Sequence, residues 1–293
     1  MLKIEPPIRL YKRPRLKNPY LIVGWADAGL VGIEAIDYLI DKLDAEEFGE
    51  IEPHYFSFLP HSIIKGGVLQ EIEYPRNTFY YWKNKKSTND LIISGSRPPA
   101  INHYQFANLI LDVAEYFKVN RIYTVGGIQA HIAHTEKPRV SAVVNNPGLK
   151  KYVMHYNISL GMNYHGPTSM NGLILGIAKQ RNIEGISLWG RIADYIGEIP
   201  NPQVCEAVLR VLTRMLDIDI DFSQIRNEAR DANTQIDELV TYIRQQDPRL
   251  DRHIGRLEKG MNVEVSAEDK QRFFEEIEEY LKQQKGRSEN DSA

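Results

Sequence analysis

The stretch Tyr20–Leu43, YLIVGWADAGLVGIEAIDYLIDKL, predicts a buried strand that passes through a glycine-rich turn into an amphipathic helix. It begins with a continuous apolar run, which is typical of a strand covered on both faces. Gly24, Gly29 and Gly32 then mark the turn, and the apolar residues after them recur at helical spacing. Backbone N–H groups at such a turn can hold an anion, whereas a tight turn with close helix–sheet packing is the alternative. The glycine spacing matches neither the dinucleotide-binding motif nor a Walker loop.

The same order of strand, loop and helix recurs along the chain. Further predicted strands lie at Leu91–Ser94, Ile122–Val125, Val140–Val144 and Ile186–Leu188, and helices at about 103–119 and 170–181. Strands that alternate with helices indicate a mainly parallel sheet with helices on both faces. Two more runs, His54–Leu59 and Thr78–Trp82, suggest an antiparallel addition to that sheet.

The character of the sequence changes near residue 220. We expect an α/β domain over residues 1–220, a helical extension over 221–285 and a disordered tail over 286–293. In the extension, helices are predicted at about 223–246 and 267–284, and the first carries a heptad-like apolar seam from Ile225 to Ile243. These two helices could pair with each other or with another subunit.

Composition excludes several classes of protein. The 293 residues carry a formal net charge of −3, so there is no basic footprint for nucleic acid. No apolar run is long enough to span a bilayer, and the N-terminus lacks the apolar segment of a signal peptide. A single cysteine, Cys205, excludes an internal disulfide and falls on a helical apolar stripe, where a structural role is expected. We therefore expect a cytoplasmic protein with no nucleic-acid or membrane partner.

Five segments in order resemble the proteasome assembly chaperone 2 family. They are GWADAGLVG (Gly24–Gly32), SGSRPP (Ser94–Pro99), TVGGIQAHIAHTEKP (Thr124–Pro138), YHGPTSMNG (Tyr164–Gly172) and IPNP (Ile199–Pro202). The resemblance covers roughly residues 15–220 and implies a three-layer α/β/α sandwich similar to purine nucleoside phosphorylases. It also implies oligomers, with chaperone-like roles in some members and no established reaction in most. We expect a homo-oligomer, with a trimer favoured and a dimer next.

Two departures from the family limit what can be carried over. Members that engage the proteasome typically end in a hydrophobic residue, a tyrosine and any residue, whereas this chain ends Asn290-Asp291-Ser292-Ala293. We therefore expect no docking to the proteasome through the C-terminus. Many bacterial relatives also carry a Pro-His-Tyr triplet where this chain has Ala193-Asp194-Tyr195, so no role of that histidine transfers.

Polar residues follow several predicted strands and mark a candidate ligand site. Crevices in open α/β sheets form outside the carboxyl ends of strands, so these residues should converge. The expected cleft is lined by Gly24, Trp25, Asp27, Gly29, Arg97, Gly127, His131, His134, Tyr164 and His165. Arg97 could bind a carboxylate or phosphate with two hydrogen bonds or pair with a structural aspartate, and the turn favours a small anion.

The residues do not single out a reaction. His131 and His134 are too few for a closed metal site, and Ser96 lacks the GxSxG turn that presents a hydrolase nucleophile. We expect no metal, no cofactor and no assigned catalytic residue. The favoured function is a non-catalytic binding or assembly-chaperone-like protein with an unknown partner. The alternative is a small-molecule enzyme of phosphorylase or hydrolase type that acts on an anionic metabolite at the carboxyl edge of the sheet.

Overall fold

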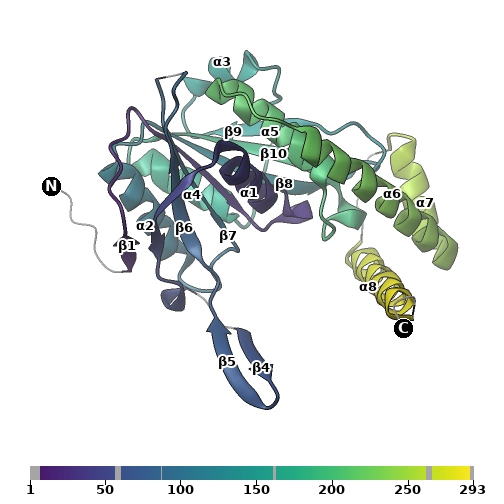
Figure 1. The fold of residues 1–293 in the computed structure, drawn as a ribbon. Coiled ribbons are helices and arrows are strands. Elements are labelled where there is room, and N and C mark those ends of the chain that lie inside the picture. Colours follow the sequence, from purple (N-terminus) through teal and green to yellow (C-terminus); the bar gives the residue numbers. More distant parts are fainter. Residues whose placement is uncertain (1–6, 57–60, 87, 161–162, 262–265, 291–293) are drawn as a thin grey trace.

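A mixed eight-stranded sheet forms the centre of the computed structural model, which describes residues 7–56, 61–86, 88–160, 163–261 and 266–290 (Figure 1). The strand order is β1-β3-β6-β7-β2-β8-β10-β9. The strands are β1 (Ile8–Leu10), β2 (Tyr20–Trp25), β3 (Glu46–Ile51), β6 (Asn77–Trp82), β7 (Leu91–Ser96), β8 (Arg121–Ala130), β9 (Val140–Val144) and β10 (Glu184–Ala193).

Only the middle of this sheet is parallel. β2 pairs in parallel with β7 and β8, and β8 with β10, whereas β1, β3, β6 and β9 all pair antiparallel. The prediction of a mainly parallel sheet therefore holds only for β7, β2, β8 and β10, and an antiparallel addition was expected on the β6 flank but not at β9. Parallel pairing needs a long crossover, which a helix supplies only between the four central strands.

One of the two runs expected to add antiparallel strands does so. Thr78–Trp82 falls within β6, which pairs antiparallel with β3 and β7. The run His54–Leu59 instead contains a short 3₁₀ helix, η2 (Pro53–Tyr55), and residues 57–60 lie outside the described residues. Pro53 has a fixed φ and no N–H group for a strand ladder, which favours this turn.

Helices cover both faces of the sheet. They are α1 (Val31–Leu43), α2 (His103–Tyr116), α3 (Leu149–Met154), α4 (Met170–Gln180), α5 (Pro202–Leu216), α6 (Ser223–Gln246), α7 (Pro248–Glu258) and α8 (Ala267–Asn290). Side chains of β2 alternate between two cores: Ile22 packs with α1 and α5, while Leu21 and Val23 pack with α2 and α4. This gives the expected layers of helix, sheet and helix, and the likeness to purine nucleoside phosphorylases stays a prediction.

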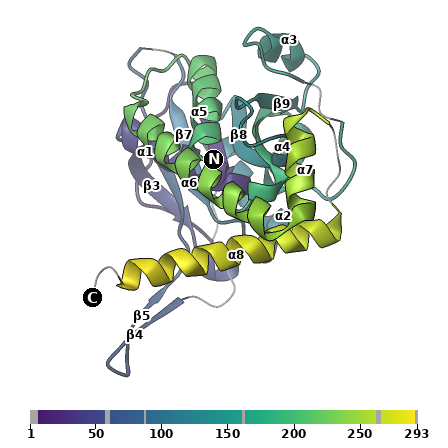
Figure 2. The ribbon, with the colours of Figure 1, turned by 90° about the vertical axis from the view of Figure 1, so that its right-hand side faces the viewer.

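The C-terminal helices pack within the chain, outside α5 (Figures 1 and 2). α6 contacts α5 at one side and α7 and α8 at the other, and its seam residues Ile225, Ile236 and Ile243 are buried. Of the two alternatives for these helices, the structure therefore shows the intramolecular one. α7 was not predicted, and α8 continues to Asn290, so the described part of the expected disordered tail is helical.

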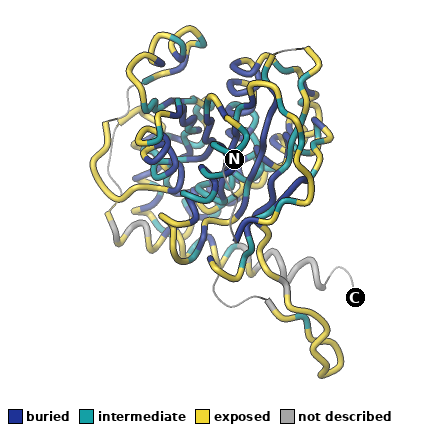
Figure 3. The backbone as a smooth tube through the Cα atoms, turned by 90° about the vertical axis from the view of Figure 1, so that its left-hand side faces the viewer, coloured by how far each residue is buried: buried dark blue, intermediate teal, exposed yellow. Residues whose placement is uncertain are grey.

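A two-stranded hairpin projects from the domain (Figures 1 and 3). β4 (His61–Lys65) and β5 (Val68–Glu73) pair only with each other, through a turn at Gly66 and Gly67. Both glycines have positive φ, 58° and 77°, which suits a two-residue hairpin turn. This hairpin was not predicted from the sequence. Among the described residues, no helix combines the length and apolar character that crossing a membrane requires.

Candidate functional site

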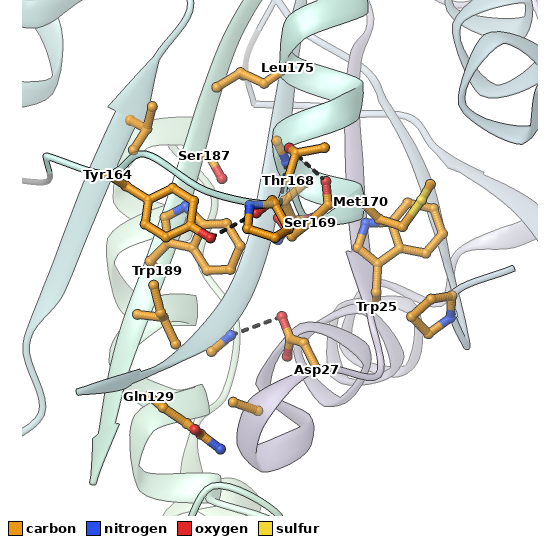
Figure 4. A pocket seen from close by; sticks show the side chains of 18 of the residues that line it. Trp25, Asp27, Gln129, Tyr164, Thr168, Ser169, Met170, Leu175, Ser187 and Trp189 are labelled. Atoms are coloured by element: carbon orange, nitrogen blue, oxygen red, sulfur yellow. Dashed lines mark hydrogen bonds between the residues drawn. The ribbon is translucent and has the colours of Figure 1, made fainter. Parts of the chain in front are cut away.

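A cavity of about 1070 Å³ lies at the carboxyl ends of the central strands (Figure 4). Its walls come from the ends of β2, β8 and β10, the N-terminal part of α4 and the segment before that helix. The polar, aromatic and glycine residues that line it include Trp25, Asp27, His103, Gly127, His131, Tyr164, Thr168, Ser169, Asn171, Gly172, Ser187, Trp189 and Asp194. The cavity therefore lies at the edge of the sheet where the strand-end argument expects a cleft.

Half of the residues expected at the site line this cavity. Those are Trp25, Asp27, Gly127, His131 and Tyr164, and those that do not line it are Gly24, Gly29, Arg97, His134 and His165. Gly24 packs so closely on α1 that an added Cβ would lie 2.3 Å from the backbone oxygen of Gly32. Arg97 and His165 are exposed, and their neighbours Pro98 and Tyr164 line the cavity in their place.

Asp27 links the turn after β2 to the neighbouring strand β8. Its Oδ1 accepts a hydrogen bond from the backbone N–H of Gly32, and its Oδ2 accepts one from that of Gly127, both at 3.0 Å. Burial raises the pKa of this carboxyl to about 7, although the two backbone N–H groups act to lower it. Asp27 thus fastens the start of α1 to β8 and remains titratable near neutral pH.

The four N–H groups from Gly29 to Gly32, in the turn before α1, all donate to acceptors within the protein. The N–H of Gly29 donates to the oxygen of Gly197 at 2.7 Å, and that of Leu30 donates to the oxygen of Asp27 at 2.9 Å. The N–H of Val31 donates to the oxygen of Ala28, and Gly32 donates to the Asp27 side chain. The tight-turn alternative therefore describes these glycines, and Gly29, with φ of 62°, adopts the left-handed conformation that the turn needs.

Asp194 is a site residue that sequence reasoning missed. Nδ1 of His131 lies 2.7 Å from Oδ2 of Asp194, where the ring N–H donates to the carboxylate. The Asp194 side chain is only 3% exposed, and its Oδ1 has no hydrogen-bond partner within the part of the chain that the structure describes. Its position directly after β10 could have identified it, because polar side chains that follow parallel strands converge at this edge of the sheet.

His134 belongs to the C-terminal helices rather than to the cavity. Its Nδ1 lies 2.7 Å from the hydroxyl of Tyr195, and its Nε2 lies 3.2 Å from Oδ1 of Asp237 in α6. Burial lowers the pKa of this histidine, although Asp237 acts to raise it. His131 and His134 therefore face different partners, and no group of three or more potential metal ligands occurs among the described residues.

Three hydroxyl groups around the cavity each take part in one internal hydrogen bond. Ser169 accepts from the N–H of Gly172, Thr168 donates to the oxygen of Ser169, and Ser187 accepts from Thr124. Among the described lining residues, none of these hydroxyls is hydrogen-bonded to His131. The arrangement lacks the nucleophile–base contact that covalent catalysis uses.

The comparisons with known proteins agree with this fold. The model of the PAC2 family matches residues 21–240. The chain belongs to the PAC2 family. The crystal structure of Pyrococcus furiosus PbaB, described as an archaeal proteasome activator, is similar at 30% identity and a TM-score of 0.69, covering 79% of this chain and 97% of PbaB.

Two further proteins are similar to this chain. An uncharacterised protein of Methanocaldococcus jannaschii is 25% identical over 227 residues, which cover 78% of this chain and 85% of that protein. Pyrococcus furiosus PbaA, described as an archaeal homologue of a proteasome-assembly chaperone, shares the fold at 21% identity and a TM-score of 0.60, covering 87% of this chain and 99% of PbaA.

Proposed function

We propose that this PAC2 family protein is a non-catalytic assembly or activating factor for a multi-subunit protein complex of the proteasome class. The observation that carries the proposal is the 30% identity to PbaB across nearly the whole of that activator. The engaged hydroxyl groups of the cavity support a role without catalysis. We also propose that the protein is soluble, oligomeric and cytoplasmic.

The projecting hairpin supplies a protein-binding surface. Residues that pair across two strands share a face, so Ile64, Leu69 and Ile72 lie on one side of the hairpin. Their exposed fractions are 64%, 54% and 45%. A two-stranded hairpin without a covered apolar face is marginal in water, so this face gains stability when another surface covers it.

A second copy of this chain fits that face best. The opposite face carries the exposed residues Lys65 and Glu71, so the hairpin contains both signs of charge beside its apolar face. Two hairpins related by a two-fold axis would join like apolar faces and leave Lys65 and Glu71 on the outer faces, exposed to solvent. The α6 seam is buried within the chain and is not available for this purpose. A two-fold contact favours a dimer, and a trimer remains the second arrangement to test.

The oligomer is tested by multi-angle light scattering of the full chain. Ile64→Ser combined with Leu69→Ser should lower the mass per particle, because both changes remove apolar area from the contact. Val68→Ser is the matched control, since Val68 is 60% exposed on the opposite face of the same hairpin. An unchanged mass in the double variant, or a wild-type protein that is monomeric at micromolar concentration, would show that the hairpin is not the contact.

The partner is tested separately with the proteasome core particle of the same organism. Native mass spectrometry should detect a complex with the core particle or its α subunits, and the peptide-hydrolysis rate should change when the full chain is added. The active-site-blocked core particle serves as the control for hydrolysis by contaminants. No complex at micromolar concentrations and an unchanged rate would refute the proteasome as partner.

A further inference from the structure

We propose that the cavity at the carboxyl ends of the strands binds a small organic cation with a planar apolar body. This goes beyond the proposed assembly role. None of the described lining residues is a lysine or an arginine, whereas Asp27 and Asp194 both line the cavity. Carboxyl oxygens and aromatic faces are the protein groups that attract cations. The lining therefore suits an amine or amidinium group rather than the anion expected from the sequence.

Three aromatic side chains from separate elements provide the walls. Trp25 comes from β2, Trp189 from β10, and Tyr164 from the segment that precedes α4 (Figure 4). Tryptophan has the ring face that attracts cations most strongly, and two of the three tryptophans in the chain line this cavity. A planar body can pack against the rings of Trp189 and Tyr164 while its charged group approaches a carboxylate. Trp25 is 2% exposed and packs against Phe106, so it supports this wall from behind.

Buried acceptors at the cavity wall call for a donor-rich ligand. Asn171 is 1% exposed, and its Nδ2 donates to the oxygen of Val125 while its Oδ1 has no partner among the described residues. Oδ1 of Asp194 is equally unpartnered, and Nε1 of Trp25 adds one unpartnered donor. Buried polar atoms are normally hydrogen-bonded. The terminal torsions of Asn and Asp are broad, so a small rotation can turn either oxygen toward a ligand N–H group.

Several of the groups that would favour an anion are already hydrogen-bonded within the protein. The N-terminus of α1 reaches the cavity, but its Gly32 N–H donates to Asp27. The N-terminus of α4 also reaches it, but the Gly172 N–H donates to Oγ of Ser169. His131 lies against Asp194, so a positive charge on that ring would be compensated by its partner. An anion that approached the N–H groups of Gly32 or Gly172 would therefore have to displace an internal hydrogen bond.

The test uses three probes of nearly equal shape and different charge. Benzamidine is cationic, benzamide neutral and benzoate anionic at neutral pH, and each is titrated into the full chain by ligand-observed NMR. Benzamidine should bind with a Kd of about 1 mM or tighter, and benzoate roughly tenfold more weakly or not at all. Benzoate binding as tightly as benzamidine would overturn the proposal, as would the absence of benzamidine binding at about 10 mM.

Two variants locate the binding at this cavity. Asp194→Asn should weaken benzamidine binding about tenfold, because it removes a charge at the wall. Asp219→Asn, the same change at an exposed position outside the cavity, should leave the affinity unchanged. If Asp194→Asn fails to fold, Trp189→Leu replaces it and should weaken binding by loss of a ring face. Unchanged affinity in the folded variant would overturn the assignment, and none of these outcomes bears on the oligomer or on the proteasome partner.

Discussion

Replacing Asp27 by asparagine should reverse its effect on stability between acid and mildly alkaline pH. Burial raises the pKa of Asp27 from its ordinary value of 3.8 to about 7. Between these values the folded protein holds a proton that the unfolded chain has released. The free energy of unfolding therefore falls as the pH rises through this window, and the loss is complete above about pH 7.

The magnitude follows from the two pKa values. They differ by roughly three pH units, and each unit corresponds to about 1.4 kcal/mol, so ionisation of Asp27 costs on the order of 4 kcal/mol of stability at alkaline pH. Asparagine does not titrate and removes this cost. It also places an amide N–H₂ group opposite one of the two backbone donors, Gly32 or Gly127, which costs about 1–3 kcal/mol at any pH.

The variant should therefore be less stable than wild type near pH 4 and more stable near pH 8. Urea unfolding followed by tryptophan fluorescence at several pH values measures the free energy of unfolding in the acid and the alkaline range. The comparison holds if the dependence of that free energy on urea concentration has the same slope in both proteins. Asp219→Asn is the control, because Asp219 is exposed and undergoes the same chemical change. If Asp27→Asn shows the same dependence on pH as wild type, the Asp27 carboxyl does not hold its proton in the folded state and the reasoning is refuted.

Three further predictions concern packing and charge. Phe273→Ala in α8 should lower the free energy of unfolding by about 3–5 kcal/mol, because Phe273 is 3% exposed. Phe274→Ala, at 46% exposure, should change it by less than about 0.5 kcal/mol in the same unfolding assay. Gly126→Ala should lower the yield of folded protein, since its Cβ would lie 2.0 Å from Oδ2 of Asp27. Gly176→Ala, with open space around it in α4, should raise the melting temperature. Burial raises the pKa of Glu34 to about 7, so this carboxyl also contributes to the fall in the free energy of unfolding as the pH rises. Glu34→Gln should make that fall smaller. If the free energy of unfolding depends on pH in the same way as in wild type, burial does not raise the pKa of Glu34.

The sequence determined the elements that depend on local pattern. The strand before the first glycine turn and the helix after it occur as predicted, and α6 spans the predicted residues 223–246. Hydrophobic periodicity and glycine placement act over a few residues, so they are readable without the fold. The hairpin was also readable, since Gly66-Gly67 between apolar runs is a hairpin signal, but this signal was overlooked.

Only the tertiary structure decided which groups meet at the candidate site. Asp27 accepts from a residue 100 positions away, and His131 contacts a carboxylate 63 positions away. Such contacts leave no periodic trace in a single sequence. They use up the N–H groups that seemed free for an anion and bring Asp194 into the cavity wall in place of Arg97. The edge of the sheet that carries the cavity follows from strand order, but the charge of its lining depends on loops that are positioned by long-range packing.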